Sequence, residues 1–315
     1  MIKYTLGRIA AMMITLFVIV TISFLIIRLM PGSVYDDPDM PVAVKEALEA
    51  KLHLDKPLLV QYSYFLKGII LENDWGMSVK VQPTVPAFQV LRSKIPTSMS
   101  LNIMALFISL PLGILFGTVA ALRKNKPTDH AVSVMVVVAI SVPSFVFASL
   151  MQYFLSFKLG IFPIIYRPNL PNAETMRSLV LPVLALGFGP IATVTRFLRG
   201  ELIETLSSEF MLLARTKGLT RVQATIRHAF RNSCVPLVNM IIGMFTGILG
   251  GSLVIERIFS IPGVGSVMMD AINSNDHPLT IASLIFYSFI SLMTILIVDI
   301  MYGVVDPRIR MGAKR

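Results

Sequence analysis

The sequence predicts an all-α polytopic membrane protein with six transmembrane helices, and three observations support this. The composition is 55% hydrophobic and only 15% charged, with a mean hydropathy of +0.74, a combination that water-soluble domains seldom show. Apolar runs of the length that a bilayer requires recur along the chain. The basic residues of the short connecting loops fall on one side of the predicted membrane.

The predicted spans are apolar runs bounded by polar or basic residues. The first, 9–27, is interpreted as an uncleaved helix because it is too long for a signal peptide and lacks a small-x-small cleavage site. The other five are 97–122, 131–157, 179–197, 236–255 and 279–298. Prolines inside spans remove backbone donors, so bends or helix starts are expected at Pro111, Pro143 and Pro182.

Lysine and arginine in the short loops predict the orientation of the chain. They gather between spans two and three, between spans four and five, and after the last span, at 123–126, 196–231 and 308–315. Short basic loops stay on the cytoplasmic side. Both termini are therefore predicted to be cytoplasmic, and the net charge of +10 reflects retained loops beside membrane lipid and not a nucleic-acid surface.

Changes in polarity divide the chain into four parts. Residues 1–30 hold the first transmembrane helix, and residues 31–96 form a small extracytoplasmic subdomain, too short for a core of its own, with a helix expected at 42–52. A transmembrane core at 97–305 contains a cytoplasmic loop at 200–235. The last part, 306–315, is a cytoplasmic tail.

The stretch 209–237 is the longest polar interruption of the C-terminal half, and its pattern predicts two helices joined by a sharp turn. Gly218 suits the end of the first helix, and Thr220 with Gln223 forms a T-x-x-Q capping box at the start of the second. Helical spacing gathers four apolar side chains on one face: Val222, Ile226, Ala229 and Phe230. Taken alone, this face fits an anionic lipid surface as well as a protein groove.

Glycines in the fifth span follow a small-residue pattern. Gly243, Gly247 and Gly251 recur at intervals of four, which lets another helix approach closely. The partner helix is either part of this chain or part of a second subunit.

The sequence contains no motif for catalysis or metal binding. There is no G-x-x-x-x-G-K-[ST], no H-E-x-x-H and no G-x-S-x-G. The single cysteine, Cys234, excludes an intrachain disulfide, and the four histidines have no ligand spacing. We therefore expect a non-enzymatic chain without a cofactor or metal of its own. An ion-coupled secondary carrier is the alternative of another class, although the spans carry almost no ionisable groups for it.

Seven sequence blocks, in order, carry a resemblance to a known family. They are LDKPLLVQYSYFLKGII (54–70), DWG (74–76), SVPSF (141–145), LGIFP (159–163), LPVLALGFGP (181–190), ERIFSIPGVG (256–265) and DPRIR (306–310). Together they resemble the permease subunit of a binding-protein-dependent ABC importer, of the dipeptide, oligopeptide and nickel family. The resemblance covers nearly the whole chain and implies a type I ABC importer permease-like fold.

The resemblance also implies a role for the stretch 209–237 as the cytoplasmic EAA loop, which in similar proteins forms a coupling helix seated in an ATPase groove. Ala214 and Gly218 match the A-x-x-x-G core of that loop. Leu212 and Leu213 depart from it, because they stand where Glu and Ala would precede Ala214. The coupling residues implied in this way are Glu209, Ala214, Lys217, Gly218, Val222, Ile226 and Phe230.

The family implies an assembly in a bacterial or archaeal plasma membrane. This subunit would join a second homologous permease subunit, two ATPase subunits and an extracytoplasmic substrate-binding protein. ATP and Mg²⁺ would then lie on the ATPase subunits. The implied cargo is a di- or oligopeptide, with nickel or another chelated metal as the alternative. We expect the binding protein to dock on the region 31–95 and on the loop around 261–265.

Overall fold

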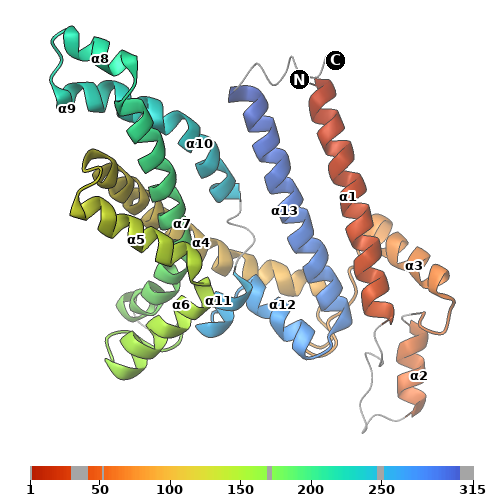
Figure 1. The fold of residues 1–315 in the computed structure, drawn as a ribbon. Helices are drawn as coiled ribbons and strands as arrows, with labels where there is room; N and C mark the ends of the chain where they lie inside the picture. Colours follow the sequence, from red (N-terminus) through yellow and green to blue (C-terminus); the bar gives the residue numbers. More distant parts are fainter. Residues whose placement is uncertain (1, 30–41, 52, 169–171, 247–251, 306–315) are drawn as a thin grey trace.

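The computed structural model describes residues 2–29, 42–51, 53–168, 172–246 and 252–305, and within these ranges the chain forms helices and no strand. The start of α1 (Ile2–Leu29), the end of α13 (His277–Val305) and a pair of short helices, α8 (Glu209–Thr216) and α9 (Arg221–Ala224), lie at the same end of the molecule (Figure 1). This end is called the coupling end below. These segments, all of which the sequence predicts to be cytoplasmic, therefore lie at one end of the molecule.

Four helices are long and apolar enough to cross a membrane, and they are α1, α4 (Ala87–Leu122), α7 (Asn172–Leu206) and α13. A bent pair of helices makes five if it counts as one span. These findings confirm an all-helical protein with membrane-spanning segments. Within the described part of the chain, four of the six predicted spans are matched by such helices, or five if the bent pair is counted.

The third predicted span is broken in two. Its first half, α5 (Pro127–Ser141), meets α6 (Ser144–Met151) and the π-helix η2 (Gln152–Lys158) at an angle of 105°. Val142 takes an extended conformation (φ −86°, ψ 122°) because the ring of the next residue, Pro143, disfavours the helical one. The expected break at Pro143 is thus confirmed, and it is sharp enough to end a straight span.

The fifth predicted span also differs from a single helix. The π-helix η3 (Thr225–Phe230) leads into α10 (Arg231–Thr246), which contains Pro236 and begins before the predicted limit. Two of the three predicted packing glycines, Gly247 and Gly251, lie outside the described residues. Two short helices follow, α11 (Leu253–Ile258) and α12 (Val264–Asn273).

At the end away from α8, the polar region after α1 holds more helix than the sequence pattern indicated. The expected helix near 42–52 is present as α2 (Val42–Lys51). A second helix, α3 (Leu58–Lys67), continues as the π-helix η1 (Gly68–Glu72). The start of α4 at Ala87 lies inside the region that was assigned to the subdomain.

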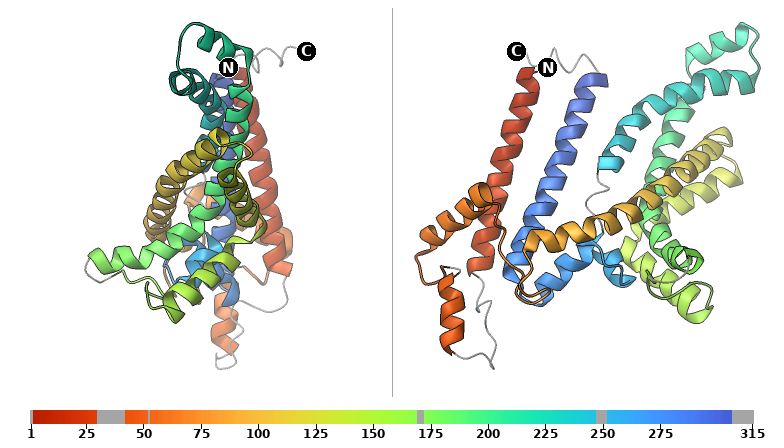
Figure 2. Two further views of the ribbon diagram at one scale, coloured as in Figure 1. Left: turned by 60° about the vertical axis from the view of Figure 1, so that its left-hand side comes forward. Right: turned by 180° about the vertical axis from the view of Figure 1, so that it is seen from behind.

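The most extensive contact in the molecule is that between α4 and α7. α4 starts near the N-terminal end of α13 and runs obliquely across the molecule to α7 (Figure 2). A Cβ added at Gly113 would lie 2.7 Å from Cβ of Val194, and one at Gly117 would lie 2.9 Å from the carbonyl oxygen of Thr195. The two helices therefore approach as closely as their backbones allow, which is how helices associate without a hydrophobic driving force. Both helices stay continuous through their internal prolines, including Pro111 and Pro182.

Candidate functional site

The coupling end is built around a cluster of small buried side chains. Ala214 of α8 and Ala224 and Ala229 of the following segment are each no more than 7% exposed, and they pack with Leu202 of α7 and Ala121 of α4. Alanine at these positions lets three helices meet closely. In the A-x-x-x-G core, Ala214 is therefore a packing residue, and Gly218 is the residue of the turn that follows α8.

The turn between α8 and α9 has the geometry that the sequence predicts. Gly218 has φ +91°, a conformation that side chains with a Cβ rarely adopt, and the space around it is open. Thr220 N donates to Gln223 Oε1 at 3.1 Å, and Gln223 N donates to Thr220 Oγ1 at 3.3 Å. The capping box is therefore confirmed, and the glycine is required by the backbone and not by crowding.

The predicted apolar face of the second helix is divided by the structure. Val222 and Ile226 are exposed, at 66% and 64%. Ala229 is buried, and Phe230 packs against the cluster formed by Leu198 and its neighbours on α7 and α10. The reason is the π-helical turn η3, whose wider i to i+5 hydrogen bonding shifts later side chains out of the α-helical register.

Exposed apolar side chains from α8, α9 and η3 form what we call the coupling surface. It consists of Phe210, Leu212, Leu213, Val222 and Ile226, which are between 41% and 67% exposed. Single exposed apolar residues are ordinary, whereas a set gathered on one end of the molecule marks an interaction site. Leu212 and Leu213, the two departures from the EAA pattern, are therefore part of the surface.

A groove of about 550 Å³ adjoins the coupling surface between α8 and α9. Glu209 lines it together with Arg215 and Arg221, so the groove carries both signs of charge. Lys217, beside the turn, is exposed. The sequence-predicted coupling residues thus share one end of the molecule, but Ala214 and Phe230 face inward, whereas Glu209, Lys217, Val222 and Ile226 reach the surface.

An ion pair that no local sequence pattern predicts joins α5 to α7 near the coupling end, between the buried Asp129 and the partly exposed Arg199. Arg199 Nε donates to Asp129 Oδ1 at 2.6 Å and Arg199 Nη2 donates to Asp129 Oδ2 at 2.8 Å. The Asp129 carboxylate is buried and also accepts from the backbone N–H of Asn125 at 2.9 Å. This bidentate pair holds the α4–α5 turn against the helix that leads into the coupling surface.

At the opposite end, a buried carboxylate holds together three segments, an arrangement that we call the Glu256 staple. Oε1 of Glu256 accepts from Ser98 Oγ on α4 at 2.7 Å. Oε2 accepts from the backbone N–H groups of Gly265 and Ser266 in the first turn of α12, at 2.8 and 3.2 Å. A carboxylate at a helix N-terminus satisfies donors that the helix itself leaves unpaired.

Close contact with this carboxylate explains the glycines of the IPGVG block. A Cβ at Gly263 would lie 2.5 Å from Cδ of Glu256, and one at Gly265 would lie 2.9 Å from its Oε2. Apart from Pro262, the loop 261–265 is buried within the chain. In this structure the loop therefore offers little surface for docking, which corrects the expectation drawn from the sequence.

A second buried carboxylate follows α12. Oδ2 of Asp276 accepts from Ser78 Oγ at 2.6 Å and from the backbone N–H groups of Val79, Lys80 and Val81, each at 3.0 Å. Four donors on one oxygen bind the loop before α4 to the α12–α13 turn. Glu256 and Asp276 thus fix α12 at both of its ends.

Comparison with known proteins decides the family. The sequence model of the binding-protein-dependent transport system inner membrane component matches residues 113–311. The model of the N-terminal part of such membrane components matches residues 1–102. The chain belongs to this family.

This chain aligns with its relatives over nearly the whole length of both proteins. The dipeptide transport system permease protein DppB of Lactococcus lactis subsp. cremoris is 39% identical over 311 residues, which are 99% of this chain and 100% of the relative. DppB of Bacillus subtilis is 36% identical over 318 residues, with 100% of both chains covered. The oligopeptide transport system permease protein OppB of Escherichia coli K12 is 34% identical over 315 residues, 98% of this chain and 100% of the relative.

A solved structure shows the likeness of fold. The crystal structure of an amino acid ABC transporter with histidines has a TM-score of 0.51 to this family member at 17% sequence identity. The likeness covers 68% of this chain and 93% of the other.

The remaining predicted site residue, Gly243, lies in α10 of this family member. A Cβ added there would be 3.9 Å from Cγ2 of Val298 in α13, which is ordinary contact. At this position α10 lies against α13 of the same chain. Among the described residues no group of three or more His, Cys, Asp or Glu is placed to hold a metal ion.

Proposed function

We propose that this chain is the transmembrane permease subunit of an ATP-driven importer and forms the pathway for di- or oligopeptides delivered by an extracytoplasmic binding protein. The relatives named as dipeptide and oligopeptide permeases support the class of cargo. The observation that carries the coupling to ATPase subunits is the coupling surface, because it gathers five exposed apolar side chains on the short helices after α7, outside the candidate membrane spans.

The coupling surface is suited to transmit a movement. Its helices, α8 and α9, pack on α7 and α4 through buried alanines, and the Arg199–Asp129 pair ties α5 to the same place. A push on Val222 and Ile226 would therefore move α4, α5 and α7 together and not only a loop. ATP binding shifts the transporter between two arrangements only if the ATPases contact these arrangements differently.

The proposed assembly contains this subunit, a second homologous permease subunit, two ATPase subunits and the binding protein. Both termini and the coupling surface lie in the cytoplasm, which agrees with the basic residues of the short loops. Six spans result when the bent α5–α6 pair serves as the third and α10 belongs to the fifth. ATP and Mg²⁺ belong to the ATPase subunits, and this chain needs no cofactor of its own.

Replacing Ile226 by Asp tests the docking role of the coupling surface. Ile226 is 64% exposed, so the change leaves the interior of the chain intact but places an unpaired charge in an apolar contact. Retention of the ATPase subunits on the purified permease complex should fall at least tenfold, which corresponds to about 1.4 kcal/mol.

Leu59→Asp is the matched control, because Leu59 is 81% exposed on α3 at the far end of the molecule. Its ATPase retention should equal that of the unchanged chain. Full retention of the ATPases by Ile226→Asp would refute the proposed docking surface.

A further inference from the structure

A cavity of about 190 Å³ lies between three helices, α4, α7 and α10. Its lining includes Asn102 and Ser109 on α4, Leu186 and Pro190 on α7, and Gly243 and Met244 on α10. Ser109, Pro190 and Gly243 lie near the middle of the predicted spans 97–122, 179–197 and 236–255. The cavity is therefore at the depth of the hydrocarbon core, where polar groups are costly and mark functional sites.

Asn102 brings a side-chain amide into this apolar setting. Its Nδ2 donates one hydrogen bond, to the carbonyl oxygen of Ser98 one helical turn earlier, at 2.8 Å. The second N–H of the amide and the acceptor Oδ1 have no partner among the residues that the structure describes. A ligand that carries both a donor and an acceptor would satisfy this amide.

α7 supplies a second acceptor. Pro190 has no N–H, so it cannot donate to the carbonyl of Leu186, four residues earlier in the same helix. Both residues line the cavity. A carbonyl that proline releases inside a membrane is tolerated where another group satisfies it. The cavity thus offers acceptors from two helices together with one amide donor, which is the complement of a peptide backbone.

The length and charge of the cavity restrict the ligand further. Asn102 and Ser109 are seven residues apart on α4, so the cavity extends about 10 Å along the helix, the length of about three residues of extended chain. None of the described residues that line it carries a charge. Its volume is below the range of about 300–1,000 Å³ that is typical of pockets for a tightly held small ligand. These properties suit a short uncharged backbone segment in passage.

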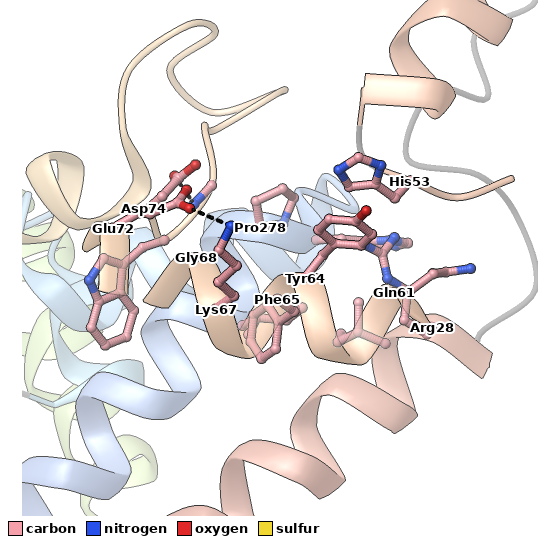
Figure 3. Close-up of a pocket in the computed structure, with 15 residues that line it drawn as sticks. Arg28, His53, Gln61, Tyr64, Phe65, Lys67, Gly68, Glu72, Asp74 and Pro278 are labelled. Atoms are coloured by element: carbon pink, nitrogen blue, oxygen red, sulfur yellow. Dashed lines mark hydrogen bonds and ion pairs between the residues drawn. The ribbon is translucent and has the colours of Figure 1, made fainter. Parts of the chain in front are cut away.

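A second cavity shows the contrast. It has a volume of about 360 Å³ and lies where α1, α3 and the start of α13 meet, away from the coupling end (Figure 3). Charges of both signs line it, among them Lys67, whose Nζ lies 3.4 Å from Oε1 of Glu72, and Asp74. These charges balance one another and select no single ligand. The polar groups of the smaller cavity are uncharged, unpaired and inside the membrane.

We propose that the cavity between α4, α7 and α10 is a subsite of the transport path, in which the Asn102 amide and the Leu186 carbonyl exchange hydrogen bonds with the backbone of the peptide cargo. This inference rests on the proposed function and adds the part of the cargo that is recognised. A peptide-bond N–H donates to Oδ1 of Asn102. Because every peptide carries such groups, the subsite accepts cargo of any sequence.

Uptake into vesicles that contain the whole complex tests the proposal. Two labelled cargoes are compared, alanylalanine and alanylsarcosine, whose methylated peptide bond has no N–H. Uptake is expressed per molecule of binding protein loaded with each cargo, so that the preference of the binding protein cancels. Asn102→Leu should lower the uptake of alanylalanine about tenfold, the effect of one lost hydrogen bond. It should affect alanylsarcosine much less, because that cargo has no N–H to donate.

Ser100→Leu is the matched control. Ser100 lies on the same helix, is exposed and bonds only to the carbonyl of Thr97, and it is not among the residues that line the cavity. This variant should carry both cargoes as the unchanged chain does. Both variants should retain the ATPase subunits and capture the binding protein equally well, which shows that the complex is assembled.

Cross-linking provides a second measurement that needs no variant. A dipeptide with a benzophenone side chain is irradiated during uptake by the unchanged complex, and the labelled residues are identified by mass spectrometry. Met244, which lines the cavity, should be among them. Label on the complex that avoids the residues of the cavity would contradict the proposal.

Two further outcomes would overturn the subsite. The first is equal uptake of alanylalanine by Asn102→Leu and Ser100→Leu. The second is an equal loss of both cargoes in Asn102→Leu, which would give Asn102 a purely structural role. The proposed function fails by a different result, the absence of ATP-dependent peptide uptake by the unchanged complex, so the two failures are distinguishable.

Discussion

Adding one methyl group at Gly263 should release the Glu256 staple. In Gly263→Ala the new Cβ would lie within 2.5 Å of both Cδ of Glu256 and Oγ of Ser98. The backbone at Gly263, with φ −100°, accepts alanine, so the effect comes from the collision alone. The carboxylate has to move, and it then loses its hydrogen bonds from the N–H groups of Gly265 and Ser266.

The size of the effect follows from these two bonds. A hydrogen bond to a charged group contributes about 1.5–3 kcal/mol, so losing two costs about 3–6 kcal/mol at a site where Glu256 is fully buried. The assay is the midpoint of thermal inactivation of the purified chain, followed by its monodisperse fraction. Gly263→Ala should lower this midpoint by several degrees.

Gly200→Ala supplies the control for Gly263→Ala. Gly200 lies in α7 with nothing within 4 Å of the added Cβ, and alanine favours a helix interior, so its midpoint should stay equal or rise. A midpoint for Gly263→Ala equal to that of the unchanged chain would refute the staple. So would additive effects of Gly263→Ala and Glu256→Gln, because residues that act through one contact are coupled.

Two further predictions concern the coupling end. Gly218→Val places a β-branched residue at φ +91°, so ATP-driven uptake should fall while the amount inserted in the membrane stays normal; unchanged uptake would remove the requirement for this turn. Asp129→Asn removes the charged partner of Arg199, whose side chain is 31% exposed, and stability should fall by about 1–3 kcal/mol, measured as the thermal inactivation midpoint. A midpoint within about a degree of the unchanged chain would contradict the structural role of this pair.

Local signals let the sequence predict the turn of the coupling end correctly. A glycine followed by T-x-x-Q specifies a helix end and a capped helix start within seven residues, and the structure contains both, at Gly218 and at Thr220 with Gln223. These features depend on backbone geometry close in sequence. The long apolar runs were equally visible, because hydropathy reflects the membrane directly.

The apolar face of the second helix could not be predicted in full. The 3.6-residue period places Phe230 with Val222 and Ile226, but the π-helical turn η3 moves Phe230 into the contact with α7 and α10. No pattern in the local sequence predicts this π-helix, because its formation depends on the tertiary packing around it. The effect of each proline also depends on its surroundings in the fold. α5 ends just before Pro143, whereas Pro111 and Pro182 lie inside continuous helices.

Buried carboxylates were also beyond sequence reasoning. Glu256 stands in the mostly apolar stretch 253–259 and Asp276 in the polar stretch 273–277, and carboxylates are rarely fully buried, so neither stretch predicts a buried carboxylate. Their partners Ser98 and Ser78 lie 158 and 198 residues away along the chain. Only the folded structure brings these groups together. It also shows why IPGVG contains glycines, because a Cβ at Gly263 or Gly265 would collide with Glu256.

Uptake into reconstituted vesicles tests the central claim most directly. The chain is inserted with its second permease subunit and the ATPase subunits, the binding protein is supplied outside, and entry of a labelled dipeptide is followed. The account predicts uptake that requires ATP and the ATPases and that is lost with Ile226→Asp on the coupling surface. Uptake by this chain alone, driven by an ion gradient without ATPases, would contradict the account and would favour a secondary carrier.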